Sequence, residues 1–505
     1  MSRTKKSLKN IFVGLVFQVI TILSNFICRT ALIRYLGIDY VSLNGLFWEI
    51  VSMLSLVEMG IGSAIVYHLY KPIADGNIEL IKKIMGLYRK CYYIIAFVCL
   101  CIGSIITVFV PYLVNGLNFS DTYLRSIFFI YVLQTVFSYM WVSDTALLQA
   151  DQKRYKTVAV QAVYKLVSTV LSLLCLYLTK SFSLYLLILL GTTMFCNITC
   201  RHQARKVYPY LTEKYVPLKK EESREIYSNV KNIFVKKAAG YVTNSTDNIC
   251  ISLLVGTIQV GFYSNYSMLF SAVRQAEQQI SNGFSASFGD LVTRERPEKV
   301  DHTLCRMTSL FQLFGMIMSC GLMACASTFV SIWIGKKYVL TAPVVFICCI
   351  NIYLTIVKDP LWQAMDACGL FAYDRNLAII STAINLVISV VLGLKLGMLG
   401  IFIGTAVSTI FEVIFKSSGI YHKKLLLPGK KYGLLWIRMA VSELTALVLS
   451  CLISEITCGN LYLDFLVHGC LAVTGAGIVY GILFSKNLSE IKKNMIKGEK
   501  LYEAL

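Results

Sequence analysis

Long apolar segments alternate with short polar joints along almost the whole chain. About 14 segments hold some 20 or more mostly apolar residues each, the length that a helix needs to cross a bilayer. They are too long and too continuously apolar for the alternating strands of a membrane barrel. The pattern therefore predicts an all-α integral membrane protein with about 14 transmembrane helices.

The longest polar joint suggests how these segments are grouped. It divides the chain into a first six-helix bundle, a cytoplasmic connector, a second six-helix bundle, and two additional transmembrane helices with a cytoplasmic tail. The corresponding residue ranges are 1–200, 201–229, 230–421 and 422–505.

The two halves also share a short pattern in the turn between their first and second helices. Gly37 is followed four residues later by Val41, and Gly256 is followed at the same spacing by Val260. Because six helices separate the two turns, both copies run in the same direction, as in repeats related by an axis along the membrane normal. Two pseudo-symmetric bundles of this kind are expected to enclose a central cavity.

One joint has an amphipathic pattern of its own. Ile78, Ile81, Ile84 and Met85 recur at helical spacing beside lysines. This pattern is typical of a helix that lies along the membrane surface, and we predict such a segment here.

Composition supports a membrane protein and fixes the expected orientation. Of 505 residues, 56% are hydrophobic and 15% charged, too little polar surface for a soluble globule of this size. The net charge is +20, and 38 of the 48 Lys and Arg residues lie at the N-terminus or in alternate joints. Since cytoplasmic joints are rich in Lys and Arg, we expect both termini in the cytoplasm, and no nucleic-acid partner is needed to explain the charge.

Catalytic and metal-binding patterns are missing from the sequence. It has neither a P-loop nor a His-Glu-x-x-His motif, and most of its 17 cysteines fall within apolar segments, as small buried hydrophobes do. The outward joints hold about a dozen residues or fewer. An enzyme that joins lipid-linked sugars would need a larger outward joint to bind both its donor and its acceptor substrate. We expect no enzyme activity and no cofactor.

The most informative stretch is the apolar hairpin of residues 243–290, because it also carries polar side chains. Asp247 lies in its first helix, and Arg274, Glu277 and Gln278 lie in its second. An ionisable residue within a membrane span costs about 2.5–3.5 kcal/mol on insertion scales and marks a functional site.

Four cations lie within predicted spans, two in each half: Arg29, Lys165, Arg274 and Lys358. Guanidinium and ammonium groups bind phosphate, and amides such as that of Gln278 bind sugar hydroxyls. These five residues are therefore predicted to bind the anionic headgroup of a substrate.

A structural explanation of these charges stays open at this point. Arg274 can pair with Glu277, Lys358 with Asp359, and Arg29 with Glu49 or Glu58. The carboxylates Asp247, Glu58 and Glu277 are candidate ligands of a coupling cation, and Asp247 can alternatively balance Arg274.

Several stretches resemble one known family. Residues 244–252, 260–266 and 285–292 look like the central region of bacterial polysaccharide flippases, which belong to the multidrug, oligosaccharidyl-lipid and polysaccharide exporter superfamily. Residues 58–65 and 397–405 are similar to that family too, and the likeness spans nearly the whole chain.

The resemblance implies a transporter that works by alternating access in the bacterial cytoplasmic membrane. It implies translocation of undecaprenyl-pyrophosphate-linked oligosaccharide repeats for O-antigen, capsule or a related polymer. Relatives that move the cell-wall lipid precursor place arginines in their first and eighth helices, which Arg29 and Arg274 match by helix and approximate depth. The partners implied are the lipid-linked oligosaccharide, membrane lipids, a coupling cation, a polysaccharide polymerase and glycosyltransferases.

Two other functions remain as alternatives. A multidrug/cation antiporter of the same superfamily is expected to favour carboxylates in its cavity. A membrane scaffold or enzyme of polysaccharide synthesis would act through its basic cytoplasmic joints instead.

Overall fold

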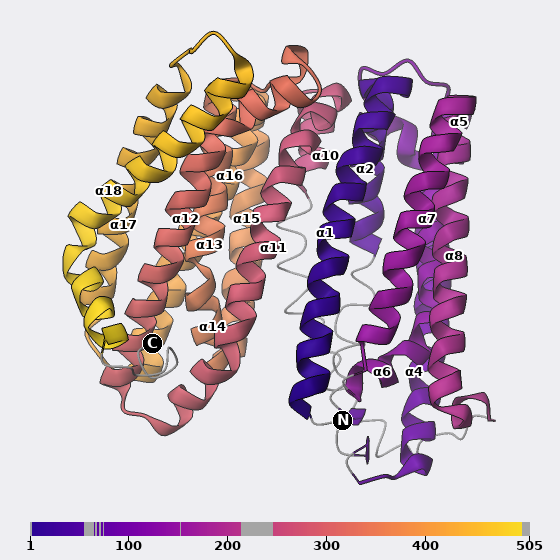
Figure 1. Ribbon diagram of the computed structural model, residues 1–505, viewed down its shortest axis with the longest axis horizontal. Helices are drawn as coiled ribbons and strands as arrows, with labels where there is room; N and C mark the ends of the chain where they lie inside the picture. The colour runs from indigo at the N-terminus through magenta and orange to yellow at the C-terminus, as the bar shows by residue number, and fades with distance from the viewer. Residues whose placement is uncertain are drawn as a thin grey trace. The chain divides into compact units, whose positions relative to one another are not determined.

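The computed structural model shown in Figure 1 is built from helices. It describes residues 3–54, 65, 68–69, 72–73, 75–151, 153–213 and 246–496, and every regular element within these ranges is a helix. The predicted all-α class is confirmed. Glu58 and residues 214–245 lie outside the described residues, so the predictions that concern them are not tested.

The chain forms two compact units, Met1–Gly261 and Phe262–Leu505, which we describe separately. The four-part division expected from the polar joints stays a prediction.

The first unit is a bundle of long helices joined by short turns. α1 and α7 pack side by side, and α8 packs against both α7 and α5. The helices are α1 (Arg3–Leu36), α2 (Ile38–Leu54), α4 (Ile78–Phe109), η2 (Val110–Leu113), α5 (Asp121–Met140), η3 (Val142–Asp144), α6 (Thr145–Ala150), α7 (Tyr155–Thr179), α8 (Phe182–Val207), η4 (Pro209–Thr212) and α10 (Asp247–Leu254).

The helix α4 corrects the prediction of a surface-lying segment. It runs without interruption from Ile78, where the Asn77 side chain caps it by accepting a hydrogen bond from the Leu80 amide, to Phe109. Ile81, Ile84 and Met85 are buried. The apolar face therefore packs into the bundle, so the predicted separate helix is wrong: the same periodicity serves the first turns of a long helix.

Both glycines of the repeated turn adopt backbone conformations that favour glycine. Gly37, between α1 and α2, has φ 92°, and Gly256, between α10 and α11 (Thr257–Arg294), has φ 131°. The second turn is fixed within the first unit, where the Thr257 amide donates to the Asn115 carbonyl (2.9 Å) and the Thr257 hydroxyl accepts from the Asn115 amide (2.7 Å). Each glycine reverses the chain where a side chain would strain the backbone.

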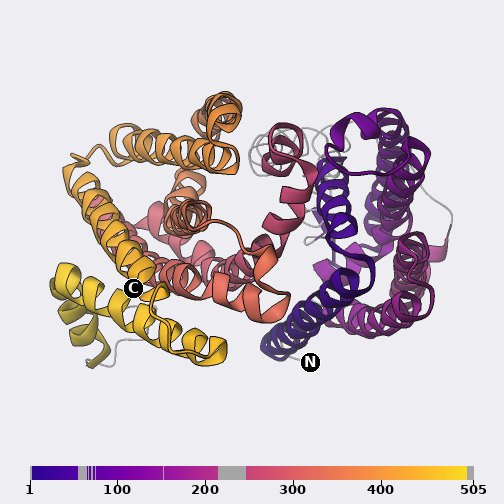
Figure 2. The same ribbon diagram turned by 90° about the horizontal axis from the view of Figure 1, so that it is seen from above.

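The second unit begins in α11 and is organised around α12. Helices α13, α17 and α18 all pack against α12, and α17 and α18, in yellow, also pack against each other (Figure 2). The helices after α11 are α12 (Pro297–Trp333), η5 (Lys336–Tyr338), α13 (Ala342–Val357), α14 (Asp359–Ala367), α15 (Phe371–Leu396), α16 (Met398–Ile420), the π-helix η6 (Tyr421–Leu425), α17 (Lys430–Ser454) and α18 (Leu461–Ile496).

Within the described residues, 10 helices are long and apolar enough to cross a membrane. The segments predicted to span at about residues 41–69 and 124–149, and the two segments of the hairpin 243–290, are not among these ten. The predicted count of about 14 stays a prediction. The protein is a multi-pass membrane protein.

Small residues allow α15 and α16 to approach closely. A Cβ atom placed on Gly400 would lie 2.2 Å from the Leu392 carbonyl oxygen, and one on Gly404 would lie 2.3 Å from the Ser389 hydroxyl. Close backbone approach at small residues is a general way in which membrane helices associate.

We predict that Gly400→Ala destabilises the protein, because the added methyl meets backbone and forces α15 and α16 apart. The expected loss is about 1–3 kcal/mol in free energy of unfolding, measured by denaturant titration in detergent. Gly321→Ala in α12 is the matched control, since a Cβ atom placed on Gly321 would have nothing within 4 Å. Equal stability of the two variants would contradict the prediction.

Candidate functional site

In the first unit, two of the predicted cations lie on neighbouring helices. Arg29 is on α1 and Lys165 on α7, which pack together. The Lys165 ammonium donates to the Asn25 side-chain oxygen at 2.8 Å, and Asn25 lies one turn before Arg29. Both cations are half-buried. The structure thus brings Arg29 and Lys165 to one stretch of the α1–α7 contact.

Neutral polar groups surround Arg29. Tyr131 and Tyr185 lie close enough to interact with its charge, and the guanidinium donates a long hydrogen bond to the Gly261 carbonyl at 3.4 Å. The Tyr131 hydroxyl donates to the Asn44 side-chain oxygen. The sequence analysis missed these hydroxyl and amide groups, because only the packing of α2, α5 and α8 brings them to α1.

In the second unit, Lys358 lies at a break between two helices. It ends α13, and α14 begins at the next residue with Pro360 in its first turn. Proline has no amide hydrogen to donate and disfavours helical geometry in the residue before it, which explains the break. The Lys358 ammonium lies 5.0 Å from the centre of the Trp362 ring, within the range of a cation–π contact.

A network of charges surrounds this break. Arg274 and Lys416 are its other cations, and Asp359 and Glu412 contribute carboxylates that interact with Lys358. The predicted cations Arg274 and Lys358 are therefore electrostatic neighbours within one unit.

Lys416 is the most completely neutralised member of the network. Its side chain is 2% exposed, and its ammonium lies 2.7 Å from Asp374 and 3.1 Å from Glu412. It also lies 3.6 Å from the centre of the Trp362 ring. These contacts show an internal structural ion cluster.

The structure does not form two of the local ion pairs considered above. Among the described residues, no nitrogen–oxygen distance within 4 Å joins Arg274 to Glu277 or Lys358 to Asp359. Glu277 is 2% exposed, and its Oε1 atom has no hydrogen-bond partner in this part of the chain. Asp359 instead accepts hydrogen bonds from Ser281 and from Gln363, the latter at 2.6 Å.

Other predicted site residues are placed as follows. Asp247 is the first residue of α10 and is half-buried, whereas Gln278 on α11 is exposed. Glu49 lies in α2, and Glu58 lies outside the described residues. Their roles in substrate or cation binding stay predictions.

A buried carboxylate in α17 was missed by the sequence analysis. Glu443 is 3% exposed, and its Oε1 atom accepts a hydrogen bond from the Ser319 hydroxyl on α12 at 2.6 Å. Its Oε2 atom is buried without a hydrogen-bond partner among the described residues. The signal in the sequence is a carboxylate within the apolar segment of residues 434–456.

The architecture is that of a multi-pass membrane protein, and its fold is similar to those of several solved structures. The fold is similar to lipid II flippase MurJ in an inward closed conformation, with TM-score 0.69, 12% identity, and coverage of 95% of this chain and 99% of that chain. It is also similar to an inward-facing multidrug resistance MATE family transporter of the MOP superfamily, with TM-score 0.61, 13% identity, and coverage of 81% and 98%. A mutant of the Vibrio cholerae MATE transporter VcmN matches with TM-score 0.56, 13% identity, and coverage of 84% and 99%.

The sequence itself identifies the family. The family profile described as polysaccharide biosynthesis protein matches residues 7–276, more than half of the chain. The protein belongs to this polysaccharide biosynthesis family. A comparison with curated protein sequences found no match.

We predict that Lys416→Met destabilises the protein by about 3–5 kcal/mol, because it leaves two buried carboxylates without their cation. Thermal unfolding in detergent measures the effect. Lys395→Met is the control, since Lys395 is exposed in the last turn of α15. Adding Asp374→Asn and Glu412→Gln to Lys416→Met is expected to restore part of the stability; no recovery would argue against the ion cluster.

Proposed function

We propose that the protein is a flippase for undecaprenyl-pyrophosphate-linked oligosaccharide repeat units in surface polysaccharide assembly. Membership of the polysaccharide biosynthesis family and the transporter fold support this proposal. The observation that carries it is the pair of cations in each unit, Arg29 with Lys165 and Arg274 with Lys358, on helices of a membrane protein.

The chemistry of these residues suits the headgroup. A pyrophosphate presents several anionic oxygens, which guanidinium groups bind through paired N–H donors and ammonium groups bind as point charges. Asn25, Asn44 and Tyr131 supply amide and hydroxyl groups suited to sugar hydroxyls, next to the two cations of the first unit. In this proposal Gln278 of α11 serves the same purpose, and the polyprenyl chain stays in the bilayer.

The direction of transport follows from the proposed orientation. With both termini in the bacterial cytoplasm, as the distribution of Lys and Arg indicates, the substrate enters from the cytoplasmic leaflet and leaves to the outer one. Alternating access moves the headgroup between the two sides. Asp247, Glu58 and Glu277 are the proposed ligands of a coupling cation, and polymerase and glycosyltransferases are proposed partners.

We predict that Arg29→Ala slows transbilayer movement of a fluorescent lipid-linked oligosaccharide in proteoliposomes roughly tenfold or more. The reason is that hydrogen bonds to a charged group contribute about 1.5–3 kcal/mol. Arg29→Lys is expected to retain part of the activity. Arg125→Ala is the matched control, because Arg125 is exposed in the first turns of α5 and pairs with Asp121. Failure of the parent protein to move the lipid, or equal rates for both alanine variants, would refute the proposal.

Buried carboxylates favour a second function, the multidrug/cation antiporter. Glu277 and Glu443 each hold a buried oxygen without a hydrogen-bond partner in the described residues, an arrangement able to take up a proton or a cation. Proteoliposomes loaded with a cationic dye test this function.

If the protein is an antiporter, dye export driven by a proton or sodium gradient is expected, and Glu277→Gln is expected to abolish it. Glu455→Gln is the matched control, since Glu455 is exposed at the end of α17. Absence of export from the parent protein, together with movement of lipid-linked sugar, would decide for the flippase.

A further inference from the structure

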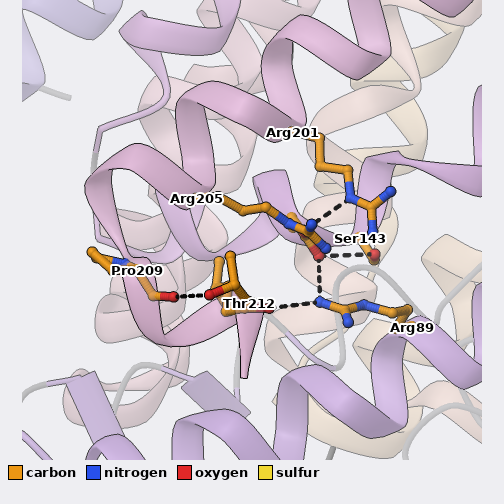
Figure 3. Close-up of polar contacts among 8 residues, drawn as sticks. Arg89, Ser143, Arg201, Arg205, Pro209 and Thr212 are labelled. Atoms are coloured by element: carbon orange, nitrogen blue, oxygen red, sulfur yellow. Dashed lines mark hydrogen bonds and ion pairs between the residues drawn. The ribbon is translucent and has the colours of Figure 1, made fainter. Parts of the chain in front are cut away.

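A single carboxylate gathers three arginines at one end of the first unit. Asp144, in η3, is 1% exposed and lies 3.0 Å from Arg89 of α4, 3.3 Å from Arg201 and 2.7 Å from Arg205, both of α8 (Figure 3). These contacts join α4, about three turns after its first residue, to the last two turns of α8.

This arginine cluster keeps a surplus of positive charge. One carboxylate neutralises one of three guanidinium groups, and each arginine side chain is about a quarter exposed. Asp144 lies outside the membrane-length helices; burial raises its pKa, but the Arg205 hydrogen bond and the charges of Arg89 and Arg201 outweigh burial and hold the pKa below its ordinary value. The carboxylate therefore stays ionised and holds the arginines in place, and Arg89 also donates a hydrogen bond to the Leu211 carbonyl at 3.2 Å.

Arg89 also belongs to a groove that runs along the outer face of α4. The groove has a volume of about 440 Å³ and is lined by Gly86, Arg89, Lys90, Tyr93, Ile94 and Phe97. These positions follow the three- and four-residue spacing of one helix face. The two cations are at one end and the apolar side chains continue for two turns.

The apolar part of the groove is open to its surroundings. Tyr93 is 44% exposed, Ile94 53% and Phe97 66%. In a membrane protein such a face meets acyl chains, and the adjacent cations meet the level of lipid phosphates.

We propose that this groove binds an anionic phospholipid, with the lipid phosphate at Arg89 and Lys90 and an acyl chain along Tyr93, Ile94 and Phe97. Charge complementarity selects an anionic headgroup, and two turns of apolar lining select a chain-bearing ligand over a free anion. A lipid bound here would contact the part of α4 that Asp144 connects to α8. The stability of the first unit would then depend on the lipid composition of the membrane. This site is independent of the transport function proposed above.

The test is binding of fluorescently labelled phosphatidylglycerol to the purified full-length protein in neutral detergent, with labelled phosphatidylcholine for comparison. We expect phosphatidylglycerol to bind at least tenfold more tightly. Lys90→Gln, which leaves the Asp144 contacts intact, is expected to weaken its binding about threefold to tenfold, and Phe97→Asn is expected to weaken both lipids. Lys83→Gln is the matched control, since Lys83 lies on α4 outside the groove and pairs with Glu79 at 3.5 Å.

Three outcomes would overturn the proposal. The first is equal affinity for the two lipids, and the second is equal binding by the Lys90→Gln and Lys83→Gln variants. The third is displacement of the labelled lipid by a competitor. Displacement by inorganic phosphate would make a free anion the occupant. Displacement by undecaprenyl pyrophosphate, at a lower concentration than phosphatidylglycerol needs, would make the transported lipid the occupant. None of these readouts requires transport activity, so failure of this proposal is distinguishable from failure of the flippase.

Discussion

The cost of placing charge in an apolar membrane governs how this protein is built. Backbone N–H and C=O groups avoid this cost by hydrogen bonding to one another inside continuous helices. Each charged side chain instead needs a partner from another helix or a ligand. Lys416 shows the first solution, with Asp374 and Glu412 closing an almost fully buried cluster. Lys165 shows another, because the group that its ammonium contacts is the neutral amide of Asn25. An amide does not neutralise the ammonium, so the positive charge of Lys165 can attract an anionic ligand. A cation paired with carboxylates, such as Lys416, is therefore structural, whereas one that contacts a neutral amide is a candidate for binding.

Helix breaks place charges where they interact. Pro360 ends α13 at Lys358, so the ammonium lies at a helix end beside Trp362 and near Arg274. On α11, Arg274, Glu277 and Ser281 recur at helical spacing, and Ser281 contacts Asp359 and Gln363 of α14. The polar face of α11 is thereby held against the broken helix by the hydrogen bonds of Ser281 with Asp359 and Gln363. In the proposed function, Arg274 and Lys358 bind the anionic headgroup of the substrate.

The arginine cluster at Asp144 shows the same principle at the edge of the membrane. There one carboxylate contacts three cations, so a surplus of positive charge remains for the anionic lipid proposed above. The basic residues that indicate orientation in the sequence are thus also architectural, since Arg89, Arg201 and Arg205 connect α4 to α8. The surplus positive charge of this cluster and the cations within the two units fit the anionic lipids proposed as ligands.

The sequence by itself determined the all-helical membrane class, the repeated glycine turns at Gly37 and Gly256, and the three cations Arg29, Lys165 and Lys358 within membrane-length helices. Each of these rests on local information: apolar length, a positive φ that favours glycine, or a charge in an apolar run. Only the tertiary structure decided which charged groups find partners, because Lys416 meets Asp374 of the preceding helix, and Glu443 of α17 accepts a hydrogen bond from Ser319 of α12. It also showed that residues 78–90 continue into α4, since an amphipathic pattern fits a surface helix and a packed helix equally well. Periodicity identifies a face, and only packing identifies what that face meets.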